Sequence, residues 1–225
     1  MSAAHATLDW REVDCVILDM DGTLLDLHFD NQLWRELLPR RYAERAGLSL
    51  DSAREQVLTR LAARHGTLPW YCLEHWSETF GVDMHALERE LGHLIGARPG
   101  AVDFLRFVRA RGLPQVLATN AHPASLARKL AATGIGEHFT DVISAHDLGA
   151  SKEYPEFWQA LTAAAPFDPA RTLFIDDNAQ VRGAARAWGI AHVYGIAQPD
   201  SRGPRLCADD ARLLESFDEL TRAAA

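Results

Sequence analysis

The stretch Val13-Asp14-Cys15-Val16-Ile17-Leu18-Asp19-Met20-Asp21-Gly22-Thr23-Leu24-Leu25-Asp26 decides the fold class of this 225-residue chain. Its short apolar run ends abruptly on Asp19 and Asp21, as in a parallel strand that is buried on both faces. The two carboxylates then lie at the carboxyl end of the strand, where open α/β sheets place their active sites. Gly22 lets the backbone turn sharply there. An Asp-Gly pair alone is more often an ordinary turn, so the later segments must decide.

From Pro99 onward, strand and helix patterns alternate along the sequence. The sequence predicts strands at 115–119, 141–144, 172–175 and 191–196, and helices at 101–110, 123–132, 156–165, 179–188 and 209–222. Strands that are separated by helices form a parallel, doubly wound sheet with right-handed crossovers. The predicted fold class is therefore α/β, with a Rossmann-like parallel sheet.

The segment between the first strand and this alternation has a different character. Its apolar residues recur at helical spacing and few residues are β-branched, which predicts about four helices, the first of them interrupted by Pro39. We expect two domains: an α/β core formed by residues 1–27 and 98–225, and an inserted helical domain formed by residues 28–97.

Composition limits the functional classes. The apolar fraction of 48% and the charged fraction of 24% are typical of a soluble globular protein. The net charge of −8 and the absence of a Lys/Arg stripe argue against a nucleic-acid partner. No apolar run approaches the roughly 18 residues of a membrane span, so no membrane partner is expected. Cys15, Cys72 and Cys207 form no metal-ligand spacing, and reduced thiols in a cytoplasmic protein are expected. The oligomeric state stays open.

Polar side chains follow four separate predicted strands at the same edge of the sheet. They are Asp19 and Asp21, Thr119 and Asn120, Lys152, and Asp176 and Asp177. Each has an ordinary alternative as a helix cap or a surface charge. Together they predict one cleft in which several carboxylates would repel one another.

A hard divalent cation removes that repulsion, and Mg²⁺ prefers carboxylate oxygens, water and substrate phosphate. Phosphoryl transfer requires chiefly positioning and charge neutralisation, and an aspartate can accept the phosphoryl group. The four motifs are therefore consistent with phosphate chemistry.

The string Asp-x-Asp-Gly-Thr-Leu-x-Asp, with the three later motifs in order, resembles the haloacid dehalogenase-like hydrolases, which are mostly Mg²⁺-dependent phosphatases. The resemblance implies that Asp19 is the nucleophile and that Asp21 is the general acid/base. It also implies that Thr119 and Lys152 bind phosphate, with Asn120 beside them. The implied magnesium ligands are Asp19, Asp21 through its backbone carbonyl, Asp177, and Asp176 as close support. Glu153 departs from the proline that commonly follows the lysine.

Residues 28–97 lie between the first and second motifs, the position of a C1-type cap in this family. Residues 24–31, 68–78 and 119–123 resemble the bacterial GMP/IMP 5′-nucleotidases, which implies a purine nucleoside monophosphate as substrate. Alternatives are a sugar-phosphate or phosphoglycolate phosphatase, a phosphomutase, or a catalytically idle binding protein. A dehalogenase is disfavoured because it needs no leaving-group acid such as Asp21.

Four large aromatic residues fall within the expected cap: Trp34, Trp70, Tyr71 and Trp76. Stacking on aromatic rings is the general way to hold a base, although the same residues can also form the core of the cap. We take Trp70 and Trp76 as candidate base contacts, and Asn31 and His122 as further candidate contacts with the substrate.

Overall fold

The computed structural model describes residues 8–206 and 212–221. It contains a six-stranded parallel sheet with the strand order β3-β2-β1-β4-β5-β6. The strands are β1 (Cys15–Leu18), β2 (Gln115–Thr119), β3 (Asp141–Ser144), β4 (Thr172–Ile175), β5 (His192–Ile196) and β6 (Leu213–Leu214). The order reverses at β1, so the chain winds in opposite directions on its two sides. The predicted doubly wound α/β fold is confirmed.

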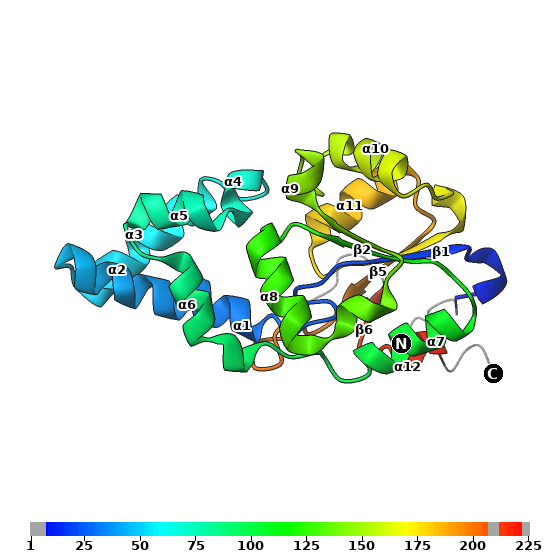
Figure 1. The fold of residues 1–225 in the computed structure, drawn as a ribbon, viewed down its shortest axis with the longest axis horizontal. Coiled ribbons are helices and arrows are strands. Elements are labelled where there is room, and N and C mark those ends of the chain that lie inside the picture. Colours follow the sequence, from blue (N-terminus) through cyan, green and yellow to red (C-terminus); the bar gives the residue numbers. More distant parts are fainter. Residues whose placement is uncertain (1–7, 207–211, 222–225) are drawn as a thin grey trace.

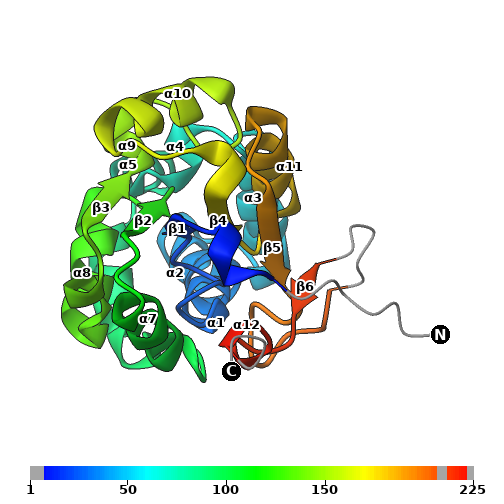
Figure 2. The same cartoon turned by 90° about the vertical axis from the view of Figure 1, so that its right-hand side faces the viewer.

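Helices cover both faces of the sheet (Figure 2). One face packs against α7 (Ala101–Ala110), α8 (Pro123–Thr133) and α12 (Asp218–Thr221), and the other against α9 (Ala145–Leu148), α10 (Pro155–Ala164) and α11 (Ala179–Trp188). In β1, Val16 and Leu18 face the first layer, whereas Ile17 faces the second. All three side chains are fully buried, which explains the uninterrupted apolar run.

Residues 28–97, which we call the helical insert, gather beyond one end of the sheet (Figure 1). The insert contains α1 (His28–Asn31), a π turn (Gln32–Leu37), α2 (Leu38–Ala46), α3 (Leu50–Ala62), α4 (Leu68–Tyr71), α5 (Leu73–Phe80) and α6 (Met84–Glu90). Its helices enclose an apolar cluster of their own around Phe29, Trp76 and Phe80.

The two segments that join the helical insert to the sheet lie side by side. Leu25 pairs with Ala97 in an antiparallel bridge. The Asp26 N–H donates to the Gly96 carbonyl at 3.0 Å, and the Arg98 N–H donates to the Leu24 carbonyl at 2.8 Å. The chain therefore leaves and re-enters the α/β part at one place. The exact domain boundaries remain a prediction.

The expected interruption at Pro39 is wrong, because α1, the π turn and α2 follow one another without a break. A proline has no N–H to donate and normally breaks an α-helix. Here the Leu38 N–H bonds to the Leu33 carbonyl, five residues back, in the widened turn before Pro39. The π turn thus carries the helix past the proline.

The predicted continuous helix at 209–222 is also wrong over the part that the structure describes. Leu213 and Leu214 instead form β6, which pairs with Gly195 and Ile196 of β5. Tertiary pairing with a sheet edge overrides the local pattern, and only Asp218–Thr221 is helical. Positions 209–211 and 222 lie outside the described residues. So does Cys207, whereas Cys15 and Cys72 are free thiols.

Within residues 8–206 and 212–221, no helix combines the length and apolar character needed to cross a bilayer.

The assignment of Leu61 to the core of the insert can be tested by replacing leucine with alanine at two positions of α3, one buried and one exposed. Leu61 is 7% exposed and Leu58 is 42% exposed. We expect Leu61→Ala to lower the free energy of unfolding by roughly 2–4 kcal/mol, because it leaves a cavity. Leu58→Ala should cost less than about 1 kcal/mol, since it removes a side chain that is largely in water. Urea denaturation measures both, and equal losses would contradict the assignment of Leu61 to the core.

Candidate active site

A cavity of about 410 Å³ lies between the carboxyl ends of the strands and the helical insert. Its lining includes Asp19, Asp21, Thr119, Lys152 and Asp177. The register brings these residues together, because Leu18 of β1 pairs with both Leu117 of β2 and Ile175 of β4. The polar residues that follow these strands therefore lie side by side at the same edge of the sheet.

Lys152 lies at the centre of this cluster. Its Nζ contacts Asp19 Oδ1 at 2.5 Å, Asp176 Oδ2 at 2.7 Å and the Ala118 carbonyl at 3.1 Å. Burial would lower the pKa of Lys152, but the charges of Asp176 and Asp19 outweigh it and raise the pKa. Burial also raises the pKa of the Asp19 carboxyl, against the opposing effect of Lys152. Asp19 and Lys152 are therefore a buried pair of opposite charges at the edge of the cavity.

The loop that carries Lys152 is fixed through its backbone. The Lys152 N–H donates to Asn120 Oδ1 at 2.9 Å, and its carbonyl accepts from Trp158 Nε1 at 2.9 Å. Asn120 Nδ2 in turn donates to Glu153 Oε2 at 3.0 Å. The oxygen and the nitrogen of the Asn120 amide therefore both form hydrogen bonds within the protein, and these bonds hold the loop in place.

Glu153 accepts two hydrogen bonds. It occupies the position where proline is common in the family that the motifs resemble. Besides accepting from Asn120, it accepts from the Tyr71 hydroxyl at 2.9 Å through Oε1. Tyr71 belongs to α4 of the insert and lines the cavity. Glu153 thus connects the insert with the end of β2.

Thr119 is buried at the end of β2 and lines the cavity. Its Oγ1 accepts from the Ala121 N–H at 3.0 Å. This bond fixes the turn after β2 and leaves the hydroxyl proton for another acceptor.

Asp19, Asp176 and Asp177 can each offer one oxygen to a common ion, since these oxygens lie within 4.8 Å of one another. Asp176 is held at both oxygens, by Lys152 and by the Asn178 N–H at 2.8 Å. Burial, together with the charges of Asp176 and Asp19, raises the pKa of Asp177 well above its usual range. A hard cation with oxygen ligands would relieve that repulsion, so the donor set fits Mg²⁺.

Gly22 makes room for the Asp177 carboxylate. It has φ +81°, and a Cβ at this position would lie 2.5 Å from Asp177 Oδ2. Any other residue would therefore strain the backbone and displace the carboxylate. The Asp-Gly turn of the first motif is thus also part of the carboxylate cluster.

Lys129 is a site residue that our sequence predictions missed. Its Nζ lies 2.7 Å from Asp21 Oδ1, and 2.9 and 3.1 Å from the two oxygens of Asp30. It is buried, and Asp30 comes from α1 of the insert. A lysine at the apolar spacing of α8, three residues after the buried Leu126, is the signal that could have found it.

The structure separates the two aromatic candidates. Trp70 lines the cavity and stacks against Trp34, with ring centroids 6.3 Å apart and planes at 29°. Trp76 does not line it: the residue is 1% exposed, and its ring stacks on Phe80 and donates to the Trp70 carbonyl at 2.7 Å. We therefore correct the assignment of Trp76 from a base contact to a residue of the insert core, because its polar N–H is satisfied there.

Asn31 and His122 both line the cavity, but each also has a protein partner. Asn31 Nδ2 donates to Asp200 Oδ2 at 2.7 Å. His122 Nε2 lies 2.9 Å from Glu74 Oε2. Their role as substrate contacts remains a prediction.

The Lys129 contacts can be tested by a double-mutant cycle. Lys129→Met leaves Asp21 and Asp30 without their buried cation, and we expect it to lower the free energy of unfolding by about 3–5 kcal/mol. Adding Asp30→Asn removes one of the stranded charges, so the double variant should lose less than the sum of the single losses. Urea denaturation of all four proteins gives the coupling energy. Strict additivity would show that Lys129 and Asp30 do not interact.

Comparison with known proteins agrees with this geometry. Residues 13–189 match the family model of haloacid dehalogenase-like hydrolases. The chain is 40% identical over 197 residues to "GMP/IMP nucleotidase YrfG" of Escherichia coli, and the match covers 88% of this chain and 89% of that protein.

Two solved structures share the fold. "HAD phosphatase from Thermococcus onnurineus" matches with a TM-score of 0.77 at 22% identity, over 93% of this chain and 97% of that one. "HAD-hydrolase YfnB from Bacillus subtilis bound to magnesium" matches with a TM-score of 0.65 at 18% identity, over 93% and 97%. With the family model spanning most of the sheet and a relative 40% identical along nearly its whole length, this chain belongs to the haloacid dehalogenase-like hydrolases and is an enzyme.

Proposed function

We propose that this hydrolase cleaves phosphomonoesters with Mg²⁺ through a phosphoryl-Asp19 intermediate, and that its substrates are purine nucleoside 5′-monophosphates such as GMP and IMP. The observation that carries the proposal is the convergence of Asp19, Asp21, Thr119, Lys152 and Asp177 on one cavity. The nucleotide assignment is supported by the 40% identity to a protein named as a GMP/IMP nucleotidase.

In this proposal, Asp19, Asp177 and the backbone carbonyl of Asp21 hold the metal, with Asp176 as close support. When bound, Mg²⁺ supplies positive charge that offsets the carboxylates and the substrate phosphate. The raised pKa of Asp177, which burial and the charges of Asp176 and Asp19 cause, agrees with a site arranged for a cation.

The first chemical step forms a bond between an Asp19 oxygen and phosphorus while the ester oxygen–phosphorus bond breaks. Asp21 gives its proton to the leaving alcohol. Lys152 Nζ, which lies 2.5 Å from Asp19 Oδ1, and the Thr119 hydroxyl would then hold the oxygens of the transferring phosphoryl group. The protein's part is chiefly positioning and charge.

In the second step, water attacks the phosphorus and the bond to Asp19 breaks, which releases phosphate. Asp21 takes the proton of that water, which restores its starting state. Lys129 holds Asp21 Oδ1 at 2.7 Å, so the remaining carboxylate oxygen is the one that exchanges the proton. Lys129 therefore acts as a positioning residue for the acid/base.

The helical insert acts as the cap in this proposal, and its aromatic rings contact the base. Trp34 and Trp70 are half-buried on the cavity wall and stack on each other. Their π faces suit a planar purine, because stacking on an aromatic ring is worth about 1–3 kcal/mol per base. Asn31 and His122 lie nearby as further candidate contacts, and Asn120 acts through the Lys152 loop.

The nucleophile is tested by Asp19→Asn, which keeps the shape and removes the charge. We expect Mg²⁺-dependent release of phosphate from p-nitrophenyl phosphate to fall to background, because an amide is a poor nucleophile. Asp14→Asn is the matched control, since Asp14 lies on the same segment and its side chain is 60% exposed. Chelation of Mg²⁺ with EDTA should stop the wild-type reaction. Turnover retained by Asp19→Asn would overturn the proposed intermediate.

The substrate class is tested by the initial rates on a panel of phosphorylated metabolites. We expect GMP and IMP to give higher kcat/KM than sugar phosphates or phosphoglycolate. A clear preference for a sugar phosphate or phosphoglycolate would replace the nucleotide assignment while leaving the phosphatase chemistry in place.

The base contact is tested by Trp70→Ala. We expect the KM for a purine mononucleotide to rise about 10-fold, equivalent to about 1.4 kcal/mol of lost stacking. The KM for p-nitrophenyl phosphate, which has no base, should change much less. An equal rise for both substrates would make Trp70 a structural residue of the insert.

A further inference from the structure

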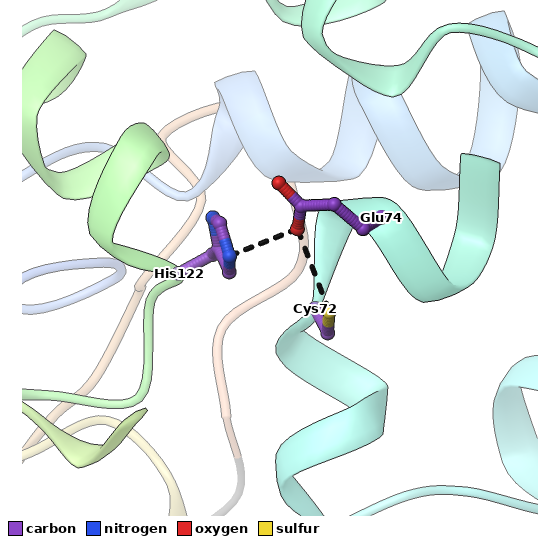
Figure 3. A group of neighbouring side chains, drawn as sticks. All are labelled: Cys72, Glu74 and His122. Carbon is purple, nitrogen blue, oxygen red and sulfur yellow. Dashed lines mark hydrogen bonds and ion pairs between the residues drawn. The ribbon is translucent and has the colours of Figure 1, made fainter. Parts of the chain in front are cut away.

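A second group of metal-ligating side chains lies where the helical insert meets the start of α8. It consists of Cys72, Glu74 and His122 (Figure 3). Glu74 Oε2 accepts from the Cys72 thiol at 3.5 Å and lies 2.9 Å from His122 Nε2. The three potential ligand atoms all lie within 4.8 Å of one another. Of the three residues, His122 alone also lines the cavity, where it is a candidate contact of the proposed substrate; Cys72 and Glu74 lie outside the cavity lining.

We propose that Cys72, Glu74 and His122 bind a divalent transition metal ion of the Zn²⁺ class, at a site separate from the aspartate cluster. One thiolate, one imidazole nitrogen and one carboxylate oxygen are the ligand types that Zn²⁺ takes in proteins. Mg²⁺ prefers a set made only of oxygens, so this group discriminates against it. Three protein ligands leave a fourth position for water.

The carboxylate of this site is already oriented. Glu74 Oε1 lies 3.1 Å from His85 Nε2, so the opposite oxygen is directed at Cys72 and His122. Such outer contacts are what hold metal ligands in place in natural sites. Partial burial raises the pKa of Glu74, but a hydrogen bond from its own backbone N–H and one from His85 lower that pKa overall. The contact with His85 therefore leaves Glu74 Oε2 directed at the other two residues.

His146 provides an independent observation. Its ring packs edge-on against His122, with centroids 5.2 Å apart. Its Nε2 is buried and has no hydrogen-bond partner among the described residues. An unsatisfied buried nitrogen is unusual. The ring contact places His146, with its unsatisfied nitrogen, next to one of the proposed ligands.

Metal binding at this site would move the protons of two of the three ligands. The Cys72 thiol releases its proton to solvent, and coordination through Nε2 places the ring proton of His122 on Nδ1. The long bond from the Ala124 N–H to Nδ1, 3.3 Å, is then given up. The Glu74 side chain is 53% exposed and that of His122 is 17% exposed, so an ion can enter from solution.

The three proposed ligands come from two different parts of the molecule. Cys72 and Glu74 lie at the start of α5 in the helical insert, whereas His122 is the N-cap residue of α8. An ion that is bound by all three would fasten the insert to the α/β part beside the cavity. We expect such an ion to slow any reaction that requires the insert to move.

The site is tested with Co²⁺ as a spectroscopic substitute, added to the intact protein in excess Mg²⁺. Wild type should take up about one Co²⁺ with a thiolate-to-metal charge-transfer absorption. Cys72→Ser should lack that band and bind the ion at least about 10-fold more weakly, since even lost outer contacts cost about 10–100-fold. His75→Ala, on the same helix but outside the cluster, is the control and should behave as wild type.

Equilibrium dialysis with Zn²⁺ gives a second measurement. Wild type should retain one ion more than Cys72→Ser, and His122→Ala should also lose it. No charge-transfer band in wild type, or an equal band in Cys72→Ser, would overturn the proposal. Because these readouts report binding alone, they are independent of the proposed phosphatase function.

Discussion

The structure depends on the neutralisation of buried charge by two lysines. Lys152 lies between Asp19 and Asp176, and Lys129 lies between Asp21 and Asp30. Isolated buried carboxylates would cost several kcal/mol each, so neither lysine can be lost without leaving a stranded charge. The two aspartates of the first motif thus contact different cations: Asp21 contacts Lys129 of α8, and Asp19 contacts Lys152 of a loop. That division fits their separate proposed duties as nucleophile and acid/base.

Each lysine also connects distant parts of the chain. Lys129 reaches from α8 of the sheet layer to Asp30 of the insert, and the Lys152 loop is tied through Asn120 and Glu153 to Tyr71 of the insert. Hydrogen bonds and ion pairs therefore connect the helical insert with the charged residues at the ends of the strands. A change at Glu153 would reach Asp19 through the Lys152 loop, although the Glu153 side chain lies outside the acidic cluster.

Much of this could be predicted from the sequence, for identifiable reasons. The apolar run before Asp19, and the polar residues after each later strand, signal a parallel sheet with a site at one edge, because the register of such a sheet is regular. The strand at 213–214 and the π turn before Pro39 could not be predicted, since both depend on hydrogen bonds to partners that the local pattern does not reveal. Lys129 was missed because its apolar spacing indicates a buried lysine but does not identify its carboxylate partners, Asp21 and Asp30. The position of Trp76 likewise follows from packing, which spacing alone does not determine.

The bridge between Leu25 and Ala97 has a consequence for how such a molecule can diversify. Because the chain leaves and re-enters the α/β part at paired residues, the distance that any inserted segment must span is fixed and short. The entropy of closing a loop rises only slowly with its length, by about 0.6 kcal/mol per doubling. The sheet would therefore accept inserts of very different size at this junction. The insert, which holds the proposed base contacts, can thus be exchanged while the proposed reacting groups stay in place.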